Sequence, residues 1–326
     1  MTLDTSGYKT FVCPAVFLSR RVPERVRAEL ERSFELAVHD DETPPSRREL
    51  LEGAAGRDGL VTMLADRVDA ELFDAAGPKL RVVASYAVGV DNVDLDEAAR
   101  RGIVVANTPG VLTQATAELT LALVLALSRR VVEGDRLVRS REPWVLSPTF
   151  MLAQGARGRT LGVVGLGRIG AEVARLASSV GMEVVYTARS PKREAPWRFL
   201  PLDGLLGEAD VVSLHCPLTP ETRHLIGRDE LRAMRPDGLL VNAARGPIVD
   251  EAALAAALAA GEIAGAALDV FEREPEVHSG LLGLENVVLV PHLGSATEDT
   301  REAMGLLCVE ALRAVLIEGR RPANAV

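Results

Sequence analysis

Short apolar runs alternate with amphipathic stretches along residues 10–107, as expected where strands and helices follow one another in turn. This pattern predicts strands over residues 10–16, 36–39, 60–64, 81–85 and 103–106 and helices over residues 24–34, 46–52, 70–76 and 95–101. Such alternation is typical of a parallel, flavodoxin-like sheet. The sequence of this part contains no glycine-rich phosphate turn.

A second alternating region follows a long apolar stretch, residues 113–132, which is expected to form one helix. The expected strands cover residues 160–164, 182–187, 211–215, 239–243, 264–270 and 287–290, and the expected helices start at residue 168 and cover residues 228–234 and 251–260. A last helix over residues 297–318 is expected to return to the first domain.

The sequence therefore predicts an α/β protein with two Rossmann-like or flavodoxin-like domains, each a doubly wound parallel sheet. A dinucleotide-binding domain of residues 108–295 would be inserted into a substrate domain made of residues 1–107 plus 296–326, with the cleft at the crossings. Ligands bind at the carboxyl ends of strands in open parallel sheets, so the candidate site residues are expected there.

A glycine motif with the spacing G-x-G-x-x-G separates the strand at residues 160–164 from the next helix. In a chain with 28 glycines, chance matches are common, and a turn that serves packing alone is the alternative interpretation. The strand-turn-helix-strand context favours a dinucleotide whose phosphates lie at the helix N-terminus. The residues expected to bind it are Gly165, Leu166, Gly167, Arg168, Ile169 and Gly170.

Charge and cysteine content narrow the classes of function. The formal net charge is −9, whereas a nucleic-acid or anionic-membrane surface needs a basic face, so neither partner is expected. The three cysteines are far apart, which favours reduced thiols in a cytoplasmic protein. The sequence shows no signal peptide, no stretch long enough to span a bilayer and no metal-ligand cluster.

The choice of nicotinamide cofactor depends on the end of the strand at residues 182–187. An NAD-binding unit usually has an acidic residue there, which accepts hydrogen bonds from the ribose hydroxyls. Here the position is Ala188, and Arg189, Ser190 and Lys192 follow it. Cations suit the 2′-phosphate of NADP(H), which the sequence therefore favours. A solvated basic loop and binding of NAD(H) are the alternatives.

Three residues near predicted strand ends have the chemistry needed to reduce a 2-oxo acid with a nicotinamide cofactor. Arg245 could direct a fork of donors at a carboxylate and a ketone oxygen, or simply make a surface ion pair. Glu274 alone could be a solvated loop residue, but paired with His292 it would orient the imidazole and raise its pKa above about 6.5. The imidazole could then donate a proton to an alkoxide.

The other candidates are weaker. His215 also ends a strand, in a run that is expected to line the cofactor, whereas the remaining histidines are expected to be exposed or satisfied by hydrogen bonds. These remaining histidines are His39, His224 and His278. The turn at Val88 and Gly89 has backbone N–H groups that could bind an anion. An equally good interpretation is that the glycine is there only because a tight turn requires it.

A family resemblance is carried by residues 61–69, 86–113, 115–130, 162–170, 214–226, 242–254, 268–275 and 286–297. Taken together, these stretches resemble the D-isomer-specific 2-hydroxyacid dehydrogenases, and within them the glyoxylate and hydroxypyruvate reductases. The resemblance extends nearly from end to end and is far more specific than the glycine motif alone. It implies reduction of glyoxylate or hydroxypyruvate by hydride transfer.

The resemblance also implies roles for individual residues. Arg245 matches the substrate-binding arginine, His292 the acid/base residue and Glu274 its carboxylate partner. Substrate would be bound by Leu64, Val88, Gly89, Arg245 and Ser295, and the cofactor would contact Cys216, Pro217, Thr222, Ala243 and Asp269, the last near the nicotinamide amide. The resemblance further implies a homodimer through the nucleotide domains, in which Trp144 could reach the neighbour's active site.

Two alternative functions remain open on the sequence. Another dehydrogenase of the same group, acting on D-lactate, phosphoglycerate or phosphite, would share the three catalytic residues but differ in the shape of its pocket. A nucleotide-sensing scaffold like the related transcriptional corepressors would keep similar residues, and would be expected to carry partner-binding extensions that this sequence does not show.

Overall fold

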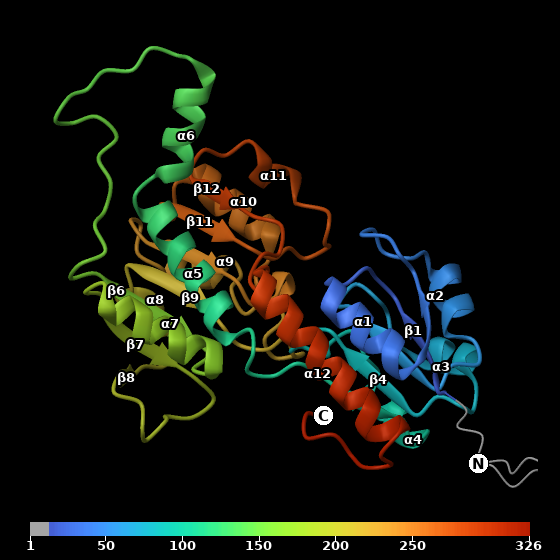
Figure 1. The fold of residues 1–326 in the computed structure, drawn as a ribbon. Coiled ribbons are helices and arrows are strands. Elements are labelled where there is room, and N and C mark those ends of the chain that lie inside the picture. The colour runs from blue at the N-terminus through green and yellow to red at the C-terminus, as the bar shows by residue number, and fades with distance from the viewer. Residues whose placement is uncertain (1–12) are drawn as a thin grey trace, which may run out of the picture. The chain divides into compact units, whose positions relative to one another are not determined.

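The computed structural model describes residues 13–326 and contains two parallel β-sheets. One unit of the chain runs up to Leu112 and resumes at Thr297–Val326, and the other is Thr113–Ala296 (Figure 1). Each unit is an α/β structure, which confirms the predicted fold class. Residues 10–12 of the first expected strand lie outside the described residues, and that strand is found at Ala15–Leu18.

The first unit has a five-stranded sheet in the order β2-β1-β3-β4-β5, the order of a flavodoxin-like doubly wound sheet. Its strands are β1 (Ala15–Leu18), β2 (Glu35–Val38), β3 (Gly59–Thr62), β4 (Val82–Ser85) and β5 (Val104–Ala106). Its helices are α1 (Glu24–Ser33), α2 (Arg47–Ala54), α3 (Ala70–Ala76), α4 (Leu95–Arg100) and α12 (Glu298–Leu316).

Side-chain caps mark where α2, α3, α4 and α12 begin, whereas α1 starts after Pro23 without one. Ser46 accepts the N–H of Glu49, whose carboxylate reaches back to the Ser46 backbone and completes a capping box at the start of α2. Asp69 caps α3, and Thr297 caps α12 through the N–H group three residues on. The last helix packs on α1 and β4 and so belongs to this unit, although the whole second unit precedes it in sequence.

The second unit has a seven-stranded parallel sheet in the order β12-β11-β10-β9-β6-β7-β8. Its strands are β6 (Thr160–Val164), β7 (Glu183–Thr187), β8 (Arg198–Phe199), β9 (Val211–Leu214), β10 (Leu239–Asn242), β11 (Gly265–Leu268) and β12 (Val287–Leu289). Its helices are α5 (Thr113–Ser128), α6 (Val131–Ser140), α7 (Arg168–Ser179), α8 (Leu202–Glu208), α9 (Arg228–Ala233), the 3₁₀ helix η1 (Gly246–Ile248), α10 (Glu251–Ala260) and α11 (Ser279–Leu282).

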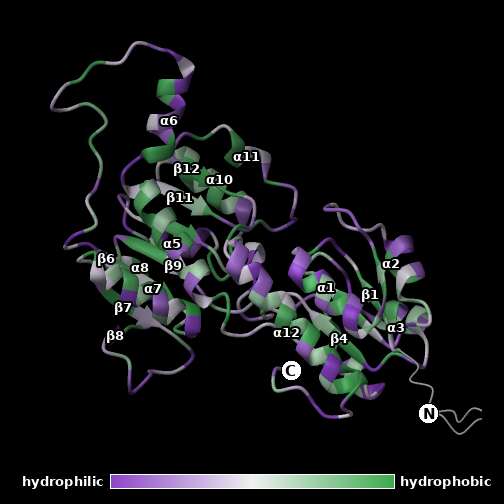
Figure 2. Ribbon diagram, viewed as in Figure 1, coloured by the Kyte–Doolittle hydropathy of each residue, from purple (hydrophilic) through white to green (hydrophobic). Residues whose placement is uncertain are grey.

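Both faces of this sheet are buried. Leu240 of β10 packs in one hydrophobic cluster together with Leu254 of α10, whereas its neighbour Val241 packs in a second cluster together with Val173 of α7. Successive strand residues point to opposite faces, so helices must cover each side of the sheet. Figure 2 accordingly shows mostly hydrophobic strands.

The structure corrects the expected long helix over residues 113–132. α5 ends at Ser128, Arg130 has a left-handed φ of 53°, and α6 begins at Val131. The apolar pattern continues across the break. Periodicity alone therefore did not show that Arg130 adopts a left-handed backbone conformation, which separates the two helices. β8, α8 and α11 were also missed, because each is short and the hydrophobic pattern of so few residues is ambiguous.

Candidate active site

The candidate residues of the second unit lie at one edge of its sheet because the strands are in register. Val164 of β6 and Asn242 of β10 both pair with Leu214 of β9, while Leu268 of β11 pairs with Asn242 and with Leu289 of β12. The chain therefore leaves these strands at the same carboxyl edge, where ligands bind in open parallel sheets. The segments concerned are residues 165–170, 215–222, 243–245, 269–274 and 290–295.

The glycine motif has the backbone geometry that a bound dinucleotide requires. Gly165 has a φ of +98°, and a Cβ on it would lie 2.6 Å from the backbone nitrogen of Cys216. A Cβ on Gly170 would lie 2.2 Å from the carbonyl oxygen of Gly165. By contrast, a Cβ on Gly167, the N-cap of α7, would have no described neighbour within 4 Å, and no side chain caps the helix. The first turn of α7 is thus open, and these residues fit a dinucleotide phosphate.

The loop after β7 contains the residues expected to select the cofactor. Arg189, Ser190 and Lys192 are exposed after Ala188, where an NAD-binding unit usually has its carboxylate. The hydroxyl of Tyr186 holds this loop, because it accepts the N–H of Lys192 at 2.7 Å and donates to the Lys192 carbonyl at 3.3 Å. Tyr186 is itself only 1% exposed, so the base of the basic loop is anchored in the core.

His292 and Glu274 form a hydrogen-bonded pair. His292 Nδ1 lies 2.8 Å from Glu274 Oε2, and Glu274 Oε1 accepts the N–H of Phe271 at 3.0 Å. Burial raises the pKa of Glu274, but the hydrogen bond and charge of His292, the Phe271 N–H and the charge of Arg245 outweigh burial and lower it below the usual value. Glu274 is therefore ionised at neutral pH and can accept a hydrogen bond from a proton on His292 Nδ1. The other ring nitrogen, His292 Nε2, is then the one that can contact a ligand.

Asp269 fixes the turn that carries His292. The Asp269 carbonyl accepts the N–H of His292 at 2.8 Å, and its two carboxylate oxygens accept the N–H groups of Leu293 and Gly294 at 2.5 and 2.9 Å. His292 has a left-handed φ of 54°, which is costly for a residue other than glycine and needs such support. Burial raises the pKa of Asp269 against the opposing effect of these contacts. Its expected place near the nicotinamide stays a prediction.

Ala243 and Arg245 lie in the turn after β10, whose shape depends on a buried amide. Asn242 Nδ2 donates to the Arg245 carbonyl at 2.9 Å, and Asn242 Oδ1 accepts a backbone N–H of the turn at 3.1 Å. A Cβ on Gly246 would lie 1.9 Å from the carbonyl carbon of Phe271, so only glycine permits this approach. The turn thus packs on the segment that follows β11. The sequence alone did not mark Asn242, a polar residue that ends an apolar strand, as part of the site.

The loop after β9 contains Cys216, Pro217 and Thr222. Thr222 Oγ1 donates to the Pro217 carbonyl at 2.7 Å and closes the loop, and burial raises the pKa of Cys216 to about 11. His215 Nε2 lies 2.8 Å from Ser213 Oγ, and Nδ1 has no hydrogen-bond partner among the described residues. Burial lowers the pKa of His215 to about 4, so this ring is neutral and unsuited to donate a proton at neutral pH.

Leu64, Val88 and Gly89 follow neighbouring strands, β3 and β4, in the first unit. The loop that contains Leu64 is fixed by the buried carboxylate of Asp66, which accepts a backbone N–H of the loop at 2.7 Å. The Val88 carbonyl accepts a hydrogen bond from Asn107 Nδ2 at 2.8 Å, which supports the turn at Gly89. These substrate candidates therefore share the carboxyl edge of the first sheet.

The structure corrects the expectation for His39. Its Nε2 atom is buried and has no hydrogen-bond partner among the described residues, so this histidine is neither exposed at that atom nor satisfied. The residue continues the backbone pairing of β2, because its N–H donates to the Leu18 carbonyl at 2.9 Å. The expectation holds for His224, which lies 2.5 Å from Glu272, and for His278, whose Nδ1 accepts the N–H of Gly280 at 3.2 Å.

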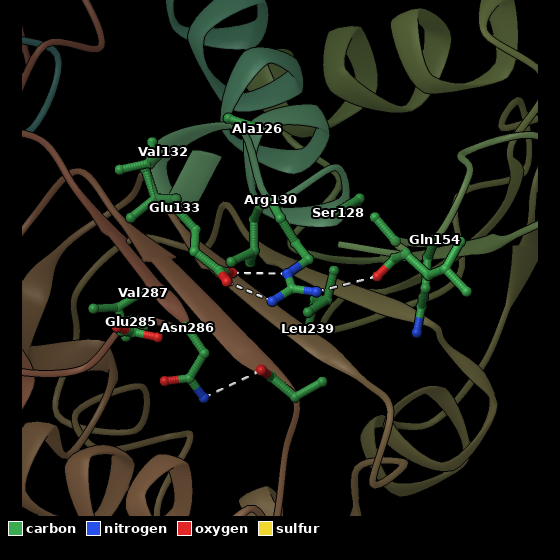
Figure 3. A pocket seen from close by; sticks show the side chains of 15 residues that line it. Ala126, Ser128, Arg130, Val132, Glu133, Gln154, Leu239, Glu285, Asn286 and Val287 are labelled. Carbon is green, nitrogen blue, oxygen red and sulfur yellow. Dashed lines mark hydrogen bonds and ion pairs between the residues drawn. The ribbon is translucent and has the colours of Figure 1, made fainter. Parts of the chain in front are cut away.

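A pocket of about 370 Å³ lies elsewhere in the second unit (Figure 3). Its lining includes Leu239 and Val287, the first residues of β10 and β12, so it lies at the amino edge of the sheet. Arg130 crosses it and pairs with Glu133. The glycine turn and His292 lie at the opposite, carboxyl edge of the sheet. This pocket is therefore separate from them and takes no part in the proposed chemistry.

Two other kinds of feature are absent from residues 13–326, the part of the chain that the structure describes. Within this range, no group of three or more His, Cys, Asp or Glu residues is arranged to hold a metal ion. The helices of the same range include none that is long and apolar enough to cross a membrane.

Comparison with known families and proteins agrees with the resemblance found in the sequence. Residues 121–294 match the family described as D-isomer specific 2-hydroxyacid dehydrogenase, NAD binding domain. A glyoxylate reductase of Korarchaeum cryptofilum is 49% identical over 320 residues, and one of Thermococcus litoralis is 47% identical over 322 residues. Each comparison covers 96% of this chain and 96% of the relative.

Solved structures show the same similarity in three dimensions. A protein of Thermus thermophilus has a TM-score of 0.91 and 49% identity over 96% of this chain and 99% of its own. The NADPH-dependent glyoxylate/hydroxypyruvate reductase of Sinorhizobium meliloti, solved in complex with NADP and malonate, has a TM-score of 0.84 and 35% identity over 97% of each chain. The similarity thus extends over almost the whole chain in sequence and in fold.

Proposed function

Because the chain belongs to the D-isomer-specific 2-hydroxyacid dehydrogenases, a family of NAD(P)-dependent oxidoreductases, we propose that it reduces glyoxylate to glycolate and hydroxypyruvate to D-glycerate with NADPH. The observation that carries the proposal is the 2.8 Å contact between His292 Nδ1 and Glu274 Oε2 at the carboxyl edge of the second sheet. The identity of 49% to a glyoxylate reductase over nearly the whole chain supports the choice of substrate.

The proposed reaction adds a hydride and a proton across the carbonyl bond of the 2-oxo acid. The dinucleotide, when bound, supplies the hydride. Arg245 binds the substrate carboxylate and polarises the ketone oxygen, which stabilises the negative charge that develops there. His292 donates the Nε2 proton to that oxygen as the alkoxide forms. Glu274 keeps the imidazole in the orientation this transfer needs.

We assign further substrate contacts to four more residues. The backbone N–H groups of Val88 and Gly89 would bind the substrate carboxylate, and Leu64 and Ser295 would line the pocket. Support comes from the placement of Leu64, Val88 and Gly89 after neighbouring strands, and from the short turn that joins Ser295 to His292. Main-chain N–H groups in a turn form an anion site without the need for a charged side chain.

The preference for NADPH rests on the loop after β7. A 2′-phosphate needs cations near the end of the second strand of the unit, and Arg189 and Lys192 lie there in the absence of a carboxylate at Ala188. The relative from Sinorhizobium meliloti, whose structure contains NADP, further supports this assignment. NADH stays the alternative cofactor.

Replacing Arg189 with aspartate is expected to lower the ratio of kcat/KM for NADPH to kcat/KM for NADH by about 10-fold or more. The change removes a cation and puts a carboxylate beside the 2′-phosphate, and 10-fold corresponds to about 1.4 kcal/mol. Arg193→Asp makes the same charge change farther along the loop and should have a smaller effect. If the ratio is unchanged in Arg189→Asp, cofactor choice depends on another part of the chain.

An assay of cofactor oxidation tests the function as a whole. Glyoxylate, hydroxypyruvate, pyruvate and a phosphorylated 2-oxo acid are compared with NADPH and with NADH, and phosphite is tested in the direction of cofactor reduction. We expect the highest kcat/KM for glyoxylate or hydroxypyruvate with NADPH. A preference for another substrate would indicate a different dehydrogenase of the family. Cofactor binding without turnover of any substrate would indicate a nucleotide-sensing protein.

We further propose a homodimer formed through the nucleotide-binding units. In Figure 1, α6 and the segment after it extend from the rest of the second unit, and the apolar side chains there include Val145 and Leu146, which are 70% and 90% exposed. Covering such side chains favours association. Trp144 lies in the same segment and is proposed to reach the neighbouring active site. The molar mass in solution should be twice that of one chain, and the mass of a single chain would contradict the proposal.

A further inference from the structure

The segment that carries Glu274 lies between β11 and α11 and has little regular secondary structure. Its internal contacts are local. The N–H of Glu276 donates to the Arg273 carbonyl at 2.9 Å, and Glu274 accepts the N–H of Phe271 at 3.0 Å. These bonds shape the turn but do not attach it to the rest of the unit. The position of Glu274 relative to His292 therefore depends on what holds the two ends of the turn.

Glu251 attaches both ends of this turn to α10. It is the first residue of that helix and is 4% exposed. One carboxylate oxygen accepts the N–H of Glu272 at 2.5 Å, and the other accepts the N–H of His278 at 3.1 Å. Glu272 and His278 lie on either side of Glu274, so one buried carboxylate closes the base of the turn. Hydrogen bonds to an ionised acceptor are stronger than those between neutral groups.

Two more contacts join the same segment to the turn after β10. The absence of a side chain on Gly246 lets that turn pack on the backbone of Phe271, where a Cβ would lie 1.9 Å away. Glu272 Oε1 lies 2.5 Å from His224 Nε2, and the N–H of His224 donates to the Pro247 carbonyl at 2.8 Å. The segments with the proposed substrate arginine and the proposed carboxylate partner are thus packed together.

We propose that Glu251 is a positioning residue for the reduction and acts through Glu274. Its carboxylate ties the ends of the turn and so keeps Glu274 Oε2 within hydrogen-bond distance of His292 Nδ1. This inference rests on the proposed function, since proton donation by His292 is what the placement serves. In the sequence, Glu251 looks like an ordinary acidic residue in the first turn of a helix. There its negative charge would only stabilise the helix, by interacting with the positive end of the helix dipole.

The first test compares kinetics. Glu251→Ala is expected to lower kcat for glyoxylate about 10-fold while KM for glyoxylate and for NADPH changes less than about 2-fold, because a displaced Glu274 weakens proton transfer rather than binding. Glu251→Gln keeps one acceptor oxygen and should give a smaller loss. In a Glu274→Gln background, Glu251→Ala should cost less than about 2-fold, since no carboxylate remains to be positioned.

Asp250→Ala is the matched control. Asp250 caps the same helix, where its side chain accepts the N–H of Ala253 at 2.9 Å, and among the described residues that side chain makes no hydrogen bond to the turn of Glu274. The control should lower the melting temperature and leave kcat unchanged. If Glu251→Ala and Asp250→Ala lose activity equally, Glu251 serves the helix alone and the inference is wrong.

The second test does not depend on turnover. The pKa of Glu274, followed by NMR of its carboxylate carbon, should lie below the usual value in the unaltered enzyme. The charged groups that face Glu274 are His292, Arg245 and Asp269. The pKa should rise in Glu251→Ala, or in Glu251→Gln if the alanine variant does not fold, because burial persists while the contact with His292 loosens. Asp250→Ala should leave it unchanged.

The two tests separate failure of the inference from failure of the proposed function. If the unaltered protein turns over no 2-oxo acid, the proposed function is wrong. A raised pKa of Glu274 in the Glu251 variants would still show that Glu251 positions Glu274. Conversely, an unchanged Glu274 pKa in a folded Glu251 variant of an active enzyme would overturn the inference and leave the function intact.

Discussion

His292→Ala is expected to lower kcat for glyoxylate reduction by about 100-fold or more, the usual scale for the loss of a general acid. The substitution removes the imidazole that lies 2.8 Å from Glu274 Oε2, and with it the proposed proton for the alkoxide. Arg245 remains to bind the substrate, so KM should change little. Oxidation of NADPH at a series of glyoxylate concentrations measures both constants.

A second substitution separates the loss of the acid from a change in the backbone. His292 has a φ of 54°, which alanine adopts at a cost and asparagine adopts more readily. His292→Asn should therefore be more stable than His292→Ala and equally impaired in kcat. If the asparagine variant turns over normally, the imidazole does not supply the proton, and the defect of the alanine variant comes from the turn.

Arg245→Ala is expected to raise KM for glyoxylate and to lower kcat, so that kcat/KM falls by about 100-fold or more. Each charge-assisted hydrogen bond contributes about 1.5–3 kcal/mol, and the guanidinium is proposed to contact both the carboxylate and the ketone oxygen of the substrate. One contact is present in the ground state and the other strengthens in the transition state, so both constants should move. Steady-state kinetics with saturating NADPH checks this result.

Arg245→Lys is the control for this prediction. Lysine keeps the positive charge but lacks the planar fork of donors that matches a carboxylate and an adjacent oxygen. KM should recover in part, whereas kcat should stay low. A change confined to KM in Arg245→Ala would instead show that the residue only binds the substrate.

Much of the fold could be predicted because it depends on neighbouring residues. The apolar run at residues 160–164 and the alanine-rich stretch at residues 251–260 form β6 and α10 over the expected ranges, and Gly165 has the positive φ that its place in the motif suggested. The break at Arg130 could not be predicted, since apolar residues continue on both sides of it and the chain turns through one left-handed residue.

The candidate site was predictable in part. Glu274 and His292 attracted attention as a carboxylate and an imidazole near strand ends, and the structure brings them into hydrogen-bond contact across a sequence separation of 18 residues. Asn242 and Glu251 were not singled out, because their signal in the sequence is a polar residue at the end of an apolar strand and an acid in the first turn of a helix. Both patterns are common and have ordinary explanations.

By itself, the sequence determined the class of fold, the glycine turn and the chemical types available at the strand ends, since periodicity and motif spacing are local properties of a chain. Only the tertiary structure decided which polar groups meet. The two amides that share the carboxylate of Glu251 lie 21 and 27 residues away, and those that share Asp269 lie 24 and 25 residues away. Such partners are chosen by strand register and packing, which bring distant segments to one edge of the sheet.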